Sequence, residues 1–232
     1  MRLNKRLVEL GVCSRRNADK LISEGRIKVN GKLASIGEQV DVNDDIEVDG
    51  NRVLNDNEKI LIAYNKPKGV ICTESKVEKA EKISDKIKEL GFDKRLFTIG
   101  RLDKDTTGLL LLTNDGDLAR EITDKKNNYE KEYEVRVSKK ITEEFLKKLE
   151  NGVYLSEIDK KTRACKTHRF GKELYRFSIT ITEGLNRQVR RMCKELGYHV
   201  TSLKRIRIMN YKLGDIKVGE YKIINRKHLG LA

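Results

Sequence analysis

The stretch from residue 187 to residue 196 has the pattern of a helix with two opposed faces. Apolar side chains recur at i, i+3, i+4 and i+7, at Val189, Met192, Cys193 and Leu196. Cations follow the same spacing two residues earlier, at Arg187, Arg190, Arg191 and Lys194. An offset of two residues turns a helix of 3.6 residues per turn by roughly 200°. We therefore expect one face to pack on a sheet, while the other presents its cations to a cleft or to solvent.

Apolar alternation elsewhere predicts the sheet on which such a helix can pack. The period of a half-buried strand is clearest at Tyr175, Phe177, Ile179 and Ile181. Residues 109–112 are consecutive leucines, which indicates a buried strand. Further strands are expected over residues 59–64, 96–99 and 133–137, and helices over residues 83–90 and 142–149. Residues 59–232 should therefore form a mixed unit of the α/β (α+β) class.

Residues 1–58 read as a smaller unit of their own. Leucines at helical spacing predict a first helix, and Ser14 can cap a second one. Asn30-Gly31 and Asp49-Gly50 are suited to tight hairpin turns, because both positions of such a turn take positive φ. We expect a compact helix-and-hairpin domain over residues 1–58, followed by the larger domain over residues 59–232.

The chain is strongly basic, with 50 Lys and Arg residues against 36 acids, a formal net charge of +14 and a pI near 9.5. Such an excess favours a polyanionic partner, and nucleic acid is the leading candidate. An A·T-rich genome, which encodes many lysines, can account for part of it. In the small unit the cations gather on the two helices, and we expect this face to dock on RNA phosphates. Its members are Arg2, Lys5, Arg6, Arg15, Arg16 and Lys20.

Several function classes lack the residues that they need. The four cysteines are far apart and form no C-x-x-C pair, which argues against zinc ribbons and redox motifs. The three histidines are widely separated, so a histidine-based triad has little raw material. The apolar run at residues 109–112 is far short of the ~20 residues that cross a bilayer, and the N-terminus has no signal-peptide core. We therefore expect a cytoplasmic protein without membrane contact.

The acids around Asp103 leave three interpretations open. Asp103, Asp105, Asp115 and Asp117 could form a metal cluster and support a metal-dependent nuclease. Alternatively, one of them could be a working carboxylate beside the arginine-rich helix. They could also be simple turn formers, which suffices to explain the pair that flanks Gly116. Spacing alone does not decide among the three.

Five stretches resemble known families in order and spacing. Residues 2–32 read RLNKRLVELGVCSRRNADKLISEGRIKVNGK and resemble the alpha-L RNA-binding motif. The other four are NKPKGVICT, IGRLDKDTTGLLLLTNDGDL, KEYEV and GLNRQVRRMCKELGY. They resemble the signature segments of the ribosomal RNA pseudouridine synthases related to the small-subunit enzyme type A. Residues 184–210 look closest to the large-subunit rRNA synthase F subgroup. The implied fold is an alpha-L domain followed by a catalytic domain with a mixed, mainly antiparallel sheet flanked by helices.

The resemblance implies a role for each matching residue. Asp103 would be the catalytic aspartate, acting as a nucleophile toward the ribose C1′ or assisting glycal formation. Tyr133 would stack on the target base and could help to remove its C5 proton, and Arg190 would pair with the Asp103 carboxylate. Four further residues would contact the substrate: Leu203 below the uracil, Arg101 in the vacated RNA stack or on a phosphate, and Arg187 and Arg191 on phosphates. Since a neighbouring arginine favours the ionised form of a carboxylate, it would keep the aspartate charged.

The implied activity is the isomerisation of a specific uridine to pseudouridine in ribosomal RNA, and 23S rRNA is the implied substrate. No metal or coenzyme would be needed. The expected partner is ribosomal RNA or a pre-ribosomal particle, with tRNA as a further candidate, and the expected state is a monomer. Alternatives are a synthase acting on 16S rRNA or tRNA, and a non-catalytic RNA-binding factor of ribosome assembly. Residues 74–94 and 155–172 match nothing that we can assign, and substrate choice could reside there.

Overall fold

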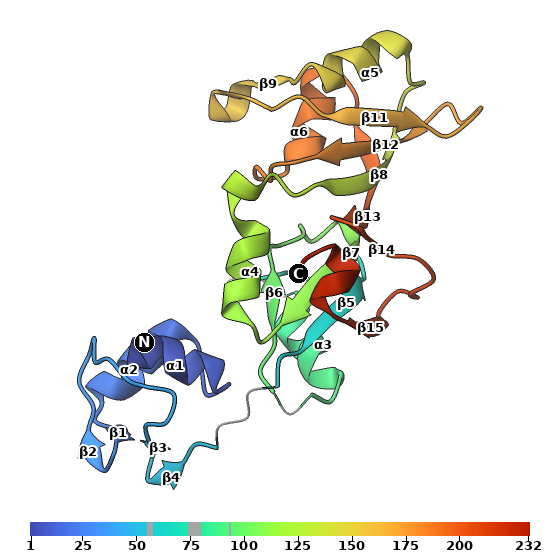
Figure 1. Cartoon of the computed structure of the whole chain (residues 1–232). Coiled ribbons are helices and arrows are strands. Elements are labelled where there is room, and N and C mark those ends of the chain that lie inside the picture. The colour runs from blue at the N-terminus through green and yellow to red at the C-terminus, as the bar shows by residue number, and fades with distance from the viewer. Residues whose placement is uncertain (55–57, 74–79, 93) are drawn as a thin grey trace.

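The computed structural model describes residues 1–54, 58–73, 80–92 and 94–232, and Figure 1 shows a small N-terminal unit beside a larger one. The small unit has two helices and an antiparallel sheet in the order β2-β1-β3-β4. Its elements are α1 (Leu3–Glu9), α2 (Arg15–Ser23), β1 (Ile27–Val29), β2 (Lys32–Leu33), β3 (Ile46–Val48) and β4 (Asn51–Arg52). Its apolar residues build a hydrophobic core separate from those of the larger unit.

The helix cap and the hairpin turns of the small unit form where its sequence predicts them. The Ser14 hydroxyl accepts a backbone N–H of the first turn of α2 at 3.3 Å. Asn30 and Gly31 have φ values of 49° and 79°, and Asp49 and Gly50 have values of 51° and 78°. These left-handed conformations suit glycine and asparagine or aspartate, so both tight turns are confirmed.

The larger unit is built on a nine-stranded sheet. Its strand order is β11-β12-β8-β13-β7-β5-β15, with β14 paired to β13 and β6 paired to β7. These strands are β5 (Leu61–Lys66), β6 (Phe97–Ile99), β7 (Thr107–Thr113), β8 (Lys131–Val137), β11 (Lys166–Arg169), β12 (Arg176–Ile181), β13 (Val200–Ile208), β14 (Tyr211–Lys212) and β15 (Tyr221–Ile224). Every described pair is antiparallel except β13 with β7. The expected mixed, mainly antiparallel sheet is confirmed.

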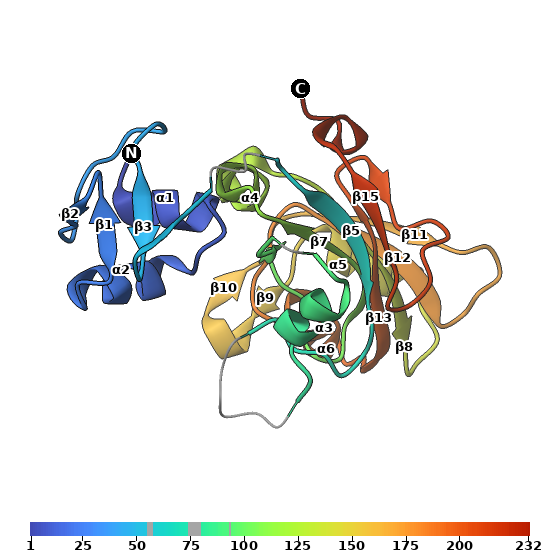
Figure 2. The same cartoon turned by 90° about the horizontal axis from the view of Figure 1, so that it is seen from below.

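Helices cover both faces of this sheet. They are α3 (Ile83–Glu89), α4 (Gly116–Thr123), α5 (Glu143–Glu150) and α6 (Gln188–Glu195), with short 3-10 turns η1 (Lys125–Asn127), η2 (Ser156–Ile158) and η3 (Arg226–Leu229). Leu110 and Leu112 of β7 share a core with α3, α5 and α6, whereas Leu109 and Leu111 share the opposite core with α4 and η3. Figure 2 shows α3 and α6 within the curve of the sheet. Because both faces are covered, all four leucines are completely buried.

The parallel junction between β7 and β13 depends on Gly108. This residue is paired with Arg205 and has a φ of +97°. A β-carbon at Gly108 would lie 2.3 Å from the carbonyl oxygen of Arg205 and 2.9 Å from its nitrogen. Only glycine fits such an approach. The loop that precedes β7 is therefore held close to β13.

A small hairpin projects from the sheet in the region that matched no family segment. It consists of β9 (Tyr154–Leu155), η2 and β10 (Lys160–Lys161), and its two strands pair with each other. We call residues 154–161 the arm. In Figure 1 the arm lies beside α6 and reaches to the left of the sheet.

The α6 helix begins at Gln188, one residue later than its pattern suggested, and Arg187 is its N-cap with a positive φ of 51°. The proposed division after residue 58 falls beside residues 55–57, and residues 74–79 and 93 of the unassigned stretch lie outside the described residues as well. None of the described helices is long and apolar enough to span a bilayer.

Candidate active site

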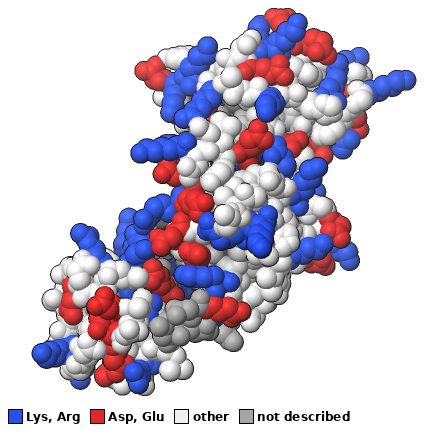
Figure 3. All heavy atoms as spheres, in the orientation of Figure 1, with Lys and Arg blue, Asp and Glu red and all other residues white. Residues whose placement is uncertain are grey.

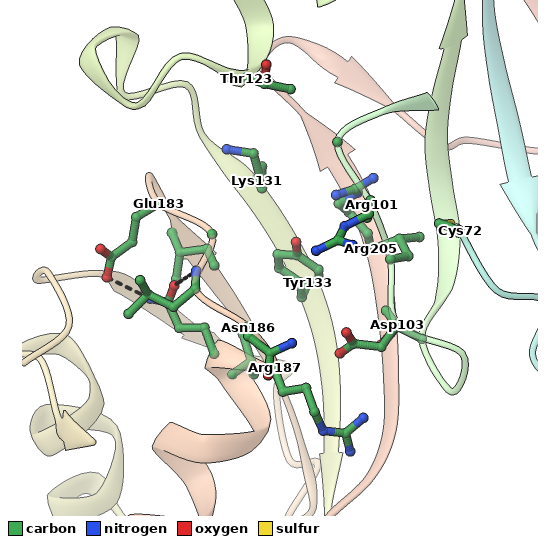
Figure 4. Close-up of a pocket in the computed structure, with 18 of the residues that line it drawn as sticks. Cys72, Arg101, Asp103, Thr123, Lys131, Tyr133, Glu183, Asn186, Arg187 and Arg205 are labelled. Carbon is green, nitrogen blue, oxygen red and sulfur yellow. Dashed lines mark hydrogen bonds between the residues drawn. The ribbon is translucent and has the colours of Figure 1, made fainter. Parts of the chain in front are cut away.

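A cavity of about 660 Å³ opens beside the parallel junction of β7 and β13. Its walls come from the loop before β7, from β8, from the turn before α6 and from β13. Figure 4 shows the labelled side chains converging from these separate segments. This volume falls within the ~300–1,000 Å³ that is usual for small-molecule sites. A single nucleoside is a small molecule of the size that such sites hold.

Asp103 lies in the wall of this cavity and is half-buried. Its carboxylate points into the cavity, toward the side on which Tyr133 and Arg187 lie (Figure 4). Its carbonyl oxygen accepts the backbone N–H of Thr106 at 3.0 Å, and the N–H of Gly69 bonds to the carbonyl of Lys104 at 2.9 Å. The backbone thus fixes the loop on both sides of the aspartate. Within the described chain, its carboxylate has no ion-pair partner.

Tyr133 and Leu203 supply an apolar surface opposite the aspartate. Tyr133 on β8 is 9% exposed and Leu203 on β13 is 5% exposed, and both line the cavity. Arg205 is the cross-strand partner of Tyr133, and its guanidinium carbon lies 6.0 Å from the centre of the tyrosine ring. Its Nε donates to the carbonyl of Leu109 at 2.7 Å, which fixes the side chain under the sheet. This arrangement is suited to an aromatic base that stacks on a tyrosine and rests on a leucine.

Arg190 takes a different partner from the one expected. Its guanidinium donates to the carbonyl oxygens of Asp105 at 3.1 Å and Val200 at 3.2 Å, and it makes no ion pair with Asp103. Burial lowers the pKa of Arg190 and the neighbouring Arg187 adds to the effect, whereas the charges of Asp105 and Asp103 oppose it. The direct Arg190–Asp103 ion pair implied by the resemblance is therefore not formed. The two charges attract each other only at longer range. The donors of Arg190 are used to hold the loop that carries the aspartate.

Lys66 is a second cation near Asp103, and it was not among the site residues expected from the sequence. It ends β5, is completely buried, and donates from Nζ to the carbonyl of Pro67 at 2.8 Å. Burial lowers the pKa of Lys66, while Asp103 and Asp105 act to raise it, which places these charges within electrostatic reach of one another. Its position inside the family segment NKPKGVICT could have identified it as a site residue.

Lys131 was missed as well. It lies at the start of β8, lines the cavity, and donates to the carbonyl of Tyr129 at 3.2 Å. Burial, followed by the charge of Arg205, lowers its pKa. The family segment KEYEV begins with this lysine and could have identified it as a site residue.

The other cations expected at the substrate are placed unevenly. Arg101 and Arg187 are exposed and line the cavity. Arg191 instead makes an ion pair with Glu157 of the arm at 2.6 Å, and Lys194 pairs with the same carboxylate at 2.5 Å. The expectation that all four cations of this helix face a cleft or solvent holds for the exposed Arg187 and Lys194, whereas Arg190 and Arg191 are half-buried. Arg191 and Lys194 fasten the arm to α6.

The basic face of the small unit is narrower than expected. Arg2, Arg15, Arg16 and Lys20 are exposed. Arg6 is 3% exposed and donates to the carbonyl of Val42 at 2.9 Å, so it is a structural residue. Lys5 pairs with Asp117 of the larger unit at 3.0 Å and thereby links the two units.

The metal-cluster interpretation of the aspartates is not supported. Asp115 caps α4 by accepting the backbone N–H groups of Asp117 and Leu118, and Asp117 pairs with Lys5. No group of three or more His, Cys, Asp or Glu side chains that could hold an ion occurs among the described residues. For the pair around Gly116, the turn-forming interpretation is the one that agrees with the structure.

Comparison with known families supplies the deciding observation. The model of the RNA pseudouridylate synthase family matches residues 60–195, and the S4 domain model matches residues 1–46. The chain belongs to the RNA pseudouridylate synthase family. It is an S4-containing RNA pseudouridine synthase, which agrees with the activity expected from its motifs.

Relatives of this synthase match over nearly its whole length. It is 44% identical to the dual-specificity RNA pseudouridine synthase RluF of Escherichia coli K12 over 224 residues, which cover 96% of this chain and 74% of that one. It is 38% identical to the ribosomal large subunit pseudouridine synthase B of Bacillus subtilis, with coverages of 94% and 90%. A crystal structure of a pseudouridylate synthase superposes with a TM-score of 0.70 at 30% identity, covering 99% of this chain and 98% of the other.

Proposed function

We propose that this synthase isomerises a specific uridine of 23S rRNA to pseudouridine and is a member of the F subgroup. The names of its relatives support this: those of the F type are dual-specificity RNA pseudouridine synthases, and those of the B type act on the ribosomal large subunit. The observation that carries the proposal is the Asp103 carboxylate, which points into a nucleoside-sized cavity opposite Tyr133 and Leu203.

The proposed chemistry begins with extrusion of the target nucleotide, since C1′ of a stacked uridine is out of reach of a side chain. Unstacking costs about a few kcal/mol. The base then stacks on Tyr133 and rests on Leu203, with its ribose toward Asp103. The carboxylate attacks C1′ or promotes glycal formation, and the N1–C1′ bond breaks. The freed uracil turns, and a C5–C1′ bond forms as the aspartyl–C1′ bond breaks or, on the glycal route, as C2′ regains its proton. The C5 proton is then lost while N1 gains one. Atoms and electrons balance without redox change or hydrolysis.

The surrounding cations have supporting roles in this proposal. Lys66 and Arg190 place positive charge near the Asp103 carboxylate. Arg190 also acts as a positioning residue, because it holds the backbone of Asp105. Arg101 would fill the gap in the RNA stack, and Arg187 would bind a phosphate.

The alpha-L domain over residues 1–58 would dock RNA through Arg2, Arg15, Arg16 and Lys20, and residues 59–232 would carry out the reaction. The expected state remains a monomer. The substrate would be ribosomal RNA or a pre-ribosomal particle in the cytoplasm. The dual specificity in the names of the F-type relatives makes a second RNA the next candidate, and tRNA is the first to test.

The test is carbodiimide primer-extension mapping of 23S rRNA and tRNA from cells with and without the gene. Deletion should remove one stop in 23S rRNA, which the wild-type gene restores and Asp103→Asn does not. An unchanged set of stops in 23S rRNA would contradict the proposed substrate. Full restoration by Asp103→Asn would contradict the role of the aspartate.

A further inference from the structure

We infer that a second hollow beside the catalytic cavity, the arm groove, binds backbone phosphates of the RNA strand that flanks the target nucleotide. The groove has a volume of about 280 Å³ and is lined by Lys125, Lys160, Lys161, Arg163 and residues 183–185. The inference rests on the proposed function for the identity of the RNA, but the groove is defined by the structure alone.

The groove is continuous with the catalytic cavity. Both hollows share Lys125 and residues 183–185 as a common wall. A nucleotide in the cavity therefore has its neighbours along the strand close to the entrance of the groove. A strand that leaves the cavity across this wall would lay its phosphates on the arm.

The cations of the groove are free to meet such a strand. Lys125, Lys160 and Lys161 are exposed, and within the described chain none of their ammonium groups has a hydrogen-bond or ion-pair partner. This contrasts with Lys148 and Lys222, which pair with acids at 2.6 and 2.7 Å elsewhere on the surface. Figure 3 shows blue side chains along the edge between the arm and α4. Cations that are solvated and unpaired attract phosphates without having to give up an existing partner.

The wall of the groove contains one acid, Glu183, against four cations. Glu183 is 8% exposed, so its carboxylate is turned away from solvent. One of its oxygens accepts the backbone N–H of Arg163 at 2.9 Å and the side-chain amide of Gln188 at 2.8 Å. With four cations and this single carboxylate, the wall carries a net positive charge.

The arm is also held in place. Glu157 pairs with Arg191 and Lys194 of α6, and Ser156 donates to Glu195 from its hydroxyl at 2.6 Å and from its backbone at 3.0 Å. These contacts use two cations of the helix to fix a hairpin that carries two unpaired lysines of its own. Arg191 and Lys194 are thus paired with an acid, whereas the arm lysines are not. Lysines of this kind sense charge and not sequence, so the ligand is the phosphate backbone.

The test compares two pairs of consecutive lysines with the same change in charge. The double variant Lys160→Gln, Lys161→Gln removes two cations from the groove. The control, Lys139→Gln with Lys140→Gln, lies in the exposed loop after β8 and lines neither hollow. Affinity for a 23S rRNA fragment containing the target is measured by fluorescence anisotropy over a salt series, and the single-turnover rate is measured at saturating RNA.

In the groove variant, affinity should fall on the order of tenfold at low salt, and the log–log salt slope should decrease by roughly 1.4–1.8, as expected for two phosphates. The loss should appear in affinity and not in the single-turnover rate. The control should keep the wild-type slope. An equal loss in both variants, or none in the groove variant, would overturn the inference. Absence of pseudouridine with the wild-type enzyme would instead contradict the proposed function, and the binding comparison would still stand.

Discussion

The catalytic cavity and the arm groove share a wall but hold their cations in opposite ways. In and behind the cavity, Lys66, Arg190 and Arg205 are buried or half-buried, and each donates to a backbone carbonyl. In the groove, Lys160 and Lys161 are exposed and unpaired within the described chain. A carbonyl fixes a cation without cancelling its charge, which is suited to stabilising charge at a reacting centre. A solvated lysine adapts to a moving polyanion and is screened by salt. We therefore expect the cavity to control rate and the groove to control affinity.

The largest effect is expected from Asp103→Asn in the catalytic cavity. This substitution keeps the shape of the side chain and removes its charge. We expect the single-turnover rate to fall by a factor on the order of 10⁴ or more, since loss of a nucleophilic group has costs of that size in other enzymes. RNA affinity should stay within about twofold, because the carboxylate takes part in bond cleavage and not in docking. The two quantities are measured on the same RNA by tritium release and by anisotropy. If Asp103→Asn lost RNA affinity but kept its single-turnover rate, the assignment of rate to the cavity and of affinity to the groove would be contradicted.

The next largest effect is expected at the junction that holds the aspartate loop. A β-carbon in Gly108→Ala would meet the carbonyl of Arg205 at 2.3 Å. We expect the free energy of unfolding to fall by ~2–4 kcal/mol, from overpacking and from alanine at positive φ. Gly69→Ala is the matched control, because Gly69 has a similar φ of +91° and nothing within 4 Å of its β-carbon position. If urea denaturation showed the same loss of unfolding free energy in both variants, the close approach of Gly108 to Arg205 would not be the cause.

Lys131 in the cavity and Lys161 in the groove offer a pH-dependent comparison. Burial lowers the pKa of Lys131, so its charged form is less favourable in the folded chain than in the unfolded chain. Below the lowered pKa, Lys131 is protonated in both the folded and the unfolded chain, and the wild type bears the full cost of burying the charge. Lys131→Met should raise stability on the order of 1 kcal/mol, or Tm by about 2–4 °C, while activity falls. As pH rises from the lowered pKa toward the usual lysine value of ~10.4, the unfolded chain binds more protons, so the advantage of the variant should shrink.

Lys161→Met is the control for this experiment, since an exposed and unpaired lysine has no burial cost to relieve. Its melting temperature should match the wild type at every pH. A stability gain for Lys131→Met that grows with pH, or one equal to that of Lys161→Met, would show that burial of the Lys131 charge is not the cause.

The features that neighbouring residues determine were predicted correctly from the sequence. The apolar face of α6 was identified correctly, because Val189, Met192 and Cys193 are at most 3% exposed. The hairpin turns and the caps of α2 and α4 were likewise encoded by neighbouring residues. Each of these features depends on contacts within a few positions along the chain.

The errors concern partners that are distant in sequence. Arg6 belongs to the basic pattern of its helix, but it is buried against the carbonyl of Val42. Arg191 was expected at a phosphate, but its partner is Glu157 in a segment without recognisable pattern. Spacing along a helix shows which side chains share a face. It does not show which of them the rest of the chain will cover or pair.

The smallest predicted effect addresses that pairing directly, through Glu157→Ala. If Arg191 and Lys194 serve to fix the arm, releasing them should make the arm lysines less effective. The affinity loss caused by Lys160→Gln with Lys161→Gln should then be smaller by about twofold in the Glu157→Ala background than in the wild type. Anisotropy titrations of the four proteins of this cycle measure the coupling, and Glu144→Ala, which breaks an exposed pair with Lys148, is the control background. If the helix cations themselves contact RNA, Glu157→Ala should instead raise affinity and leave the effect of the arm lysines unchanged. These opposite signs separate a helix that binds RNA from a helix that positions the arm.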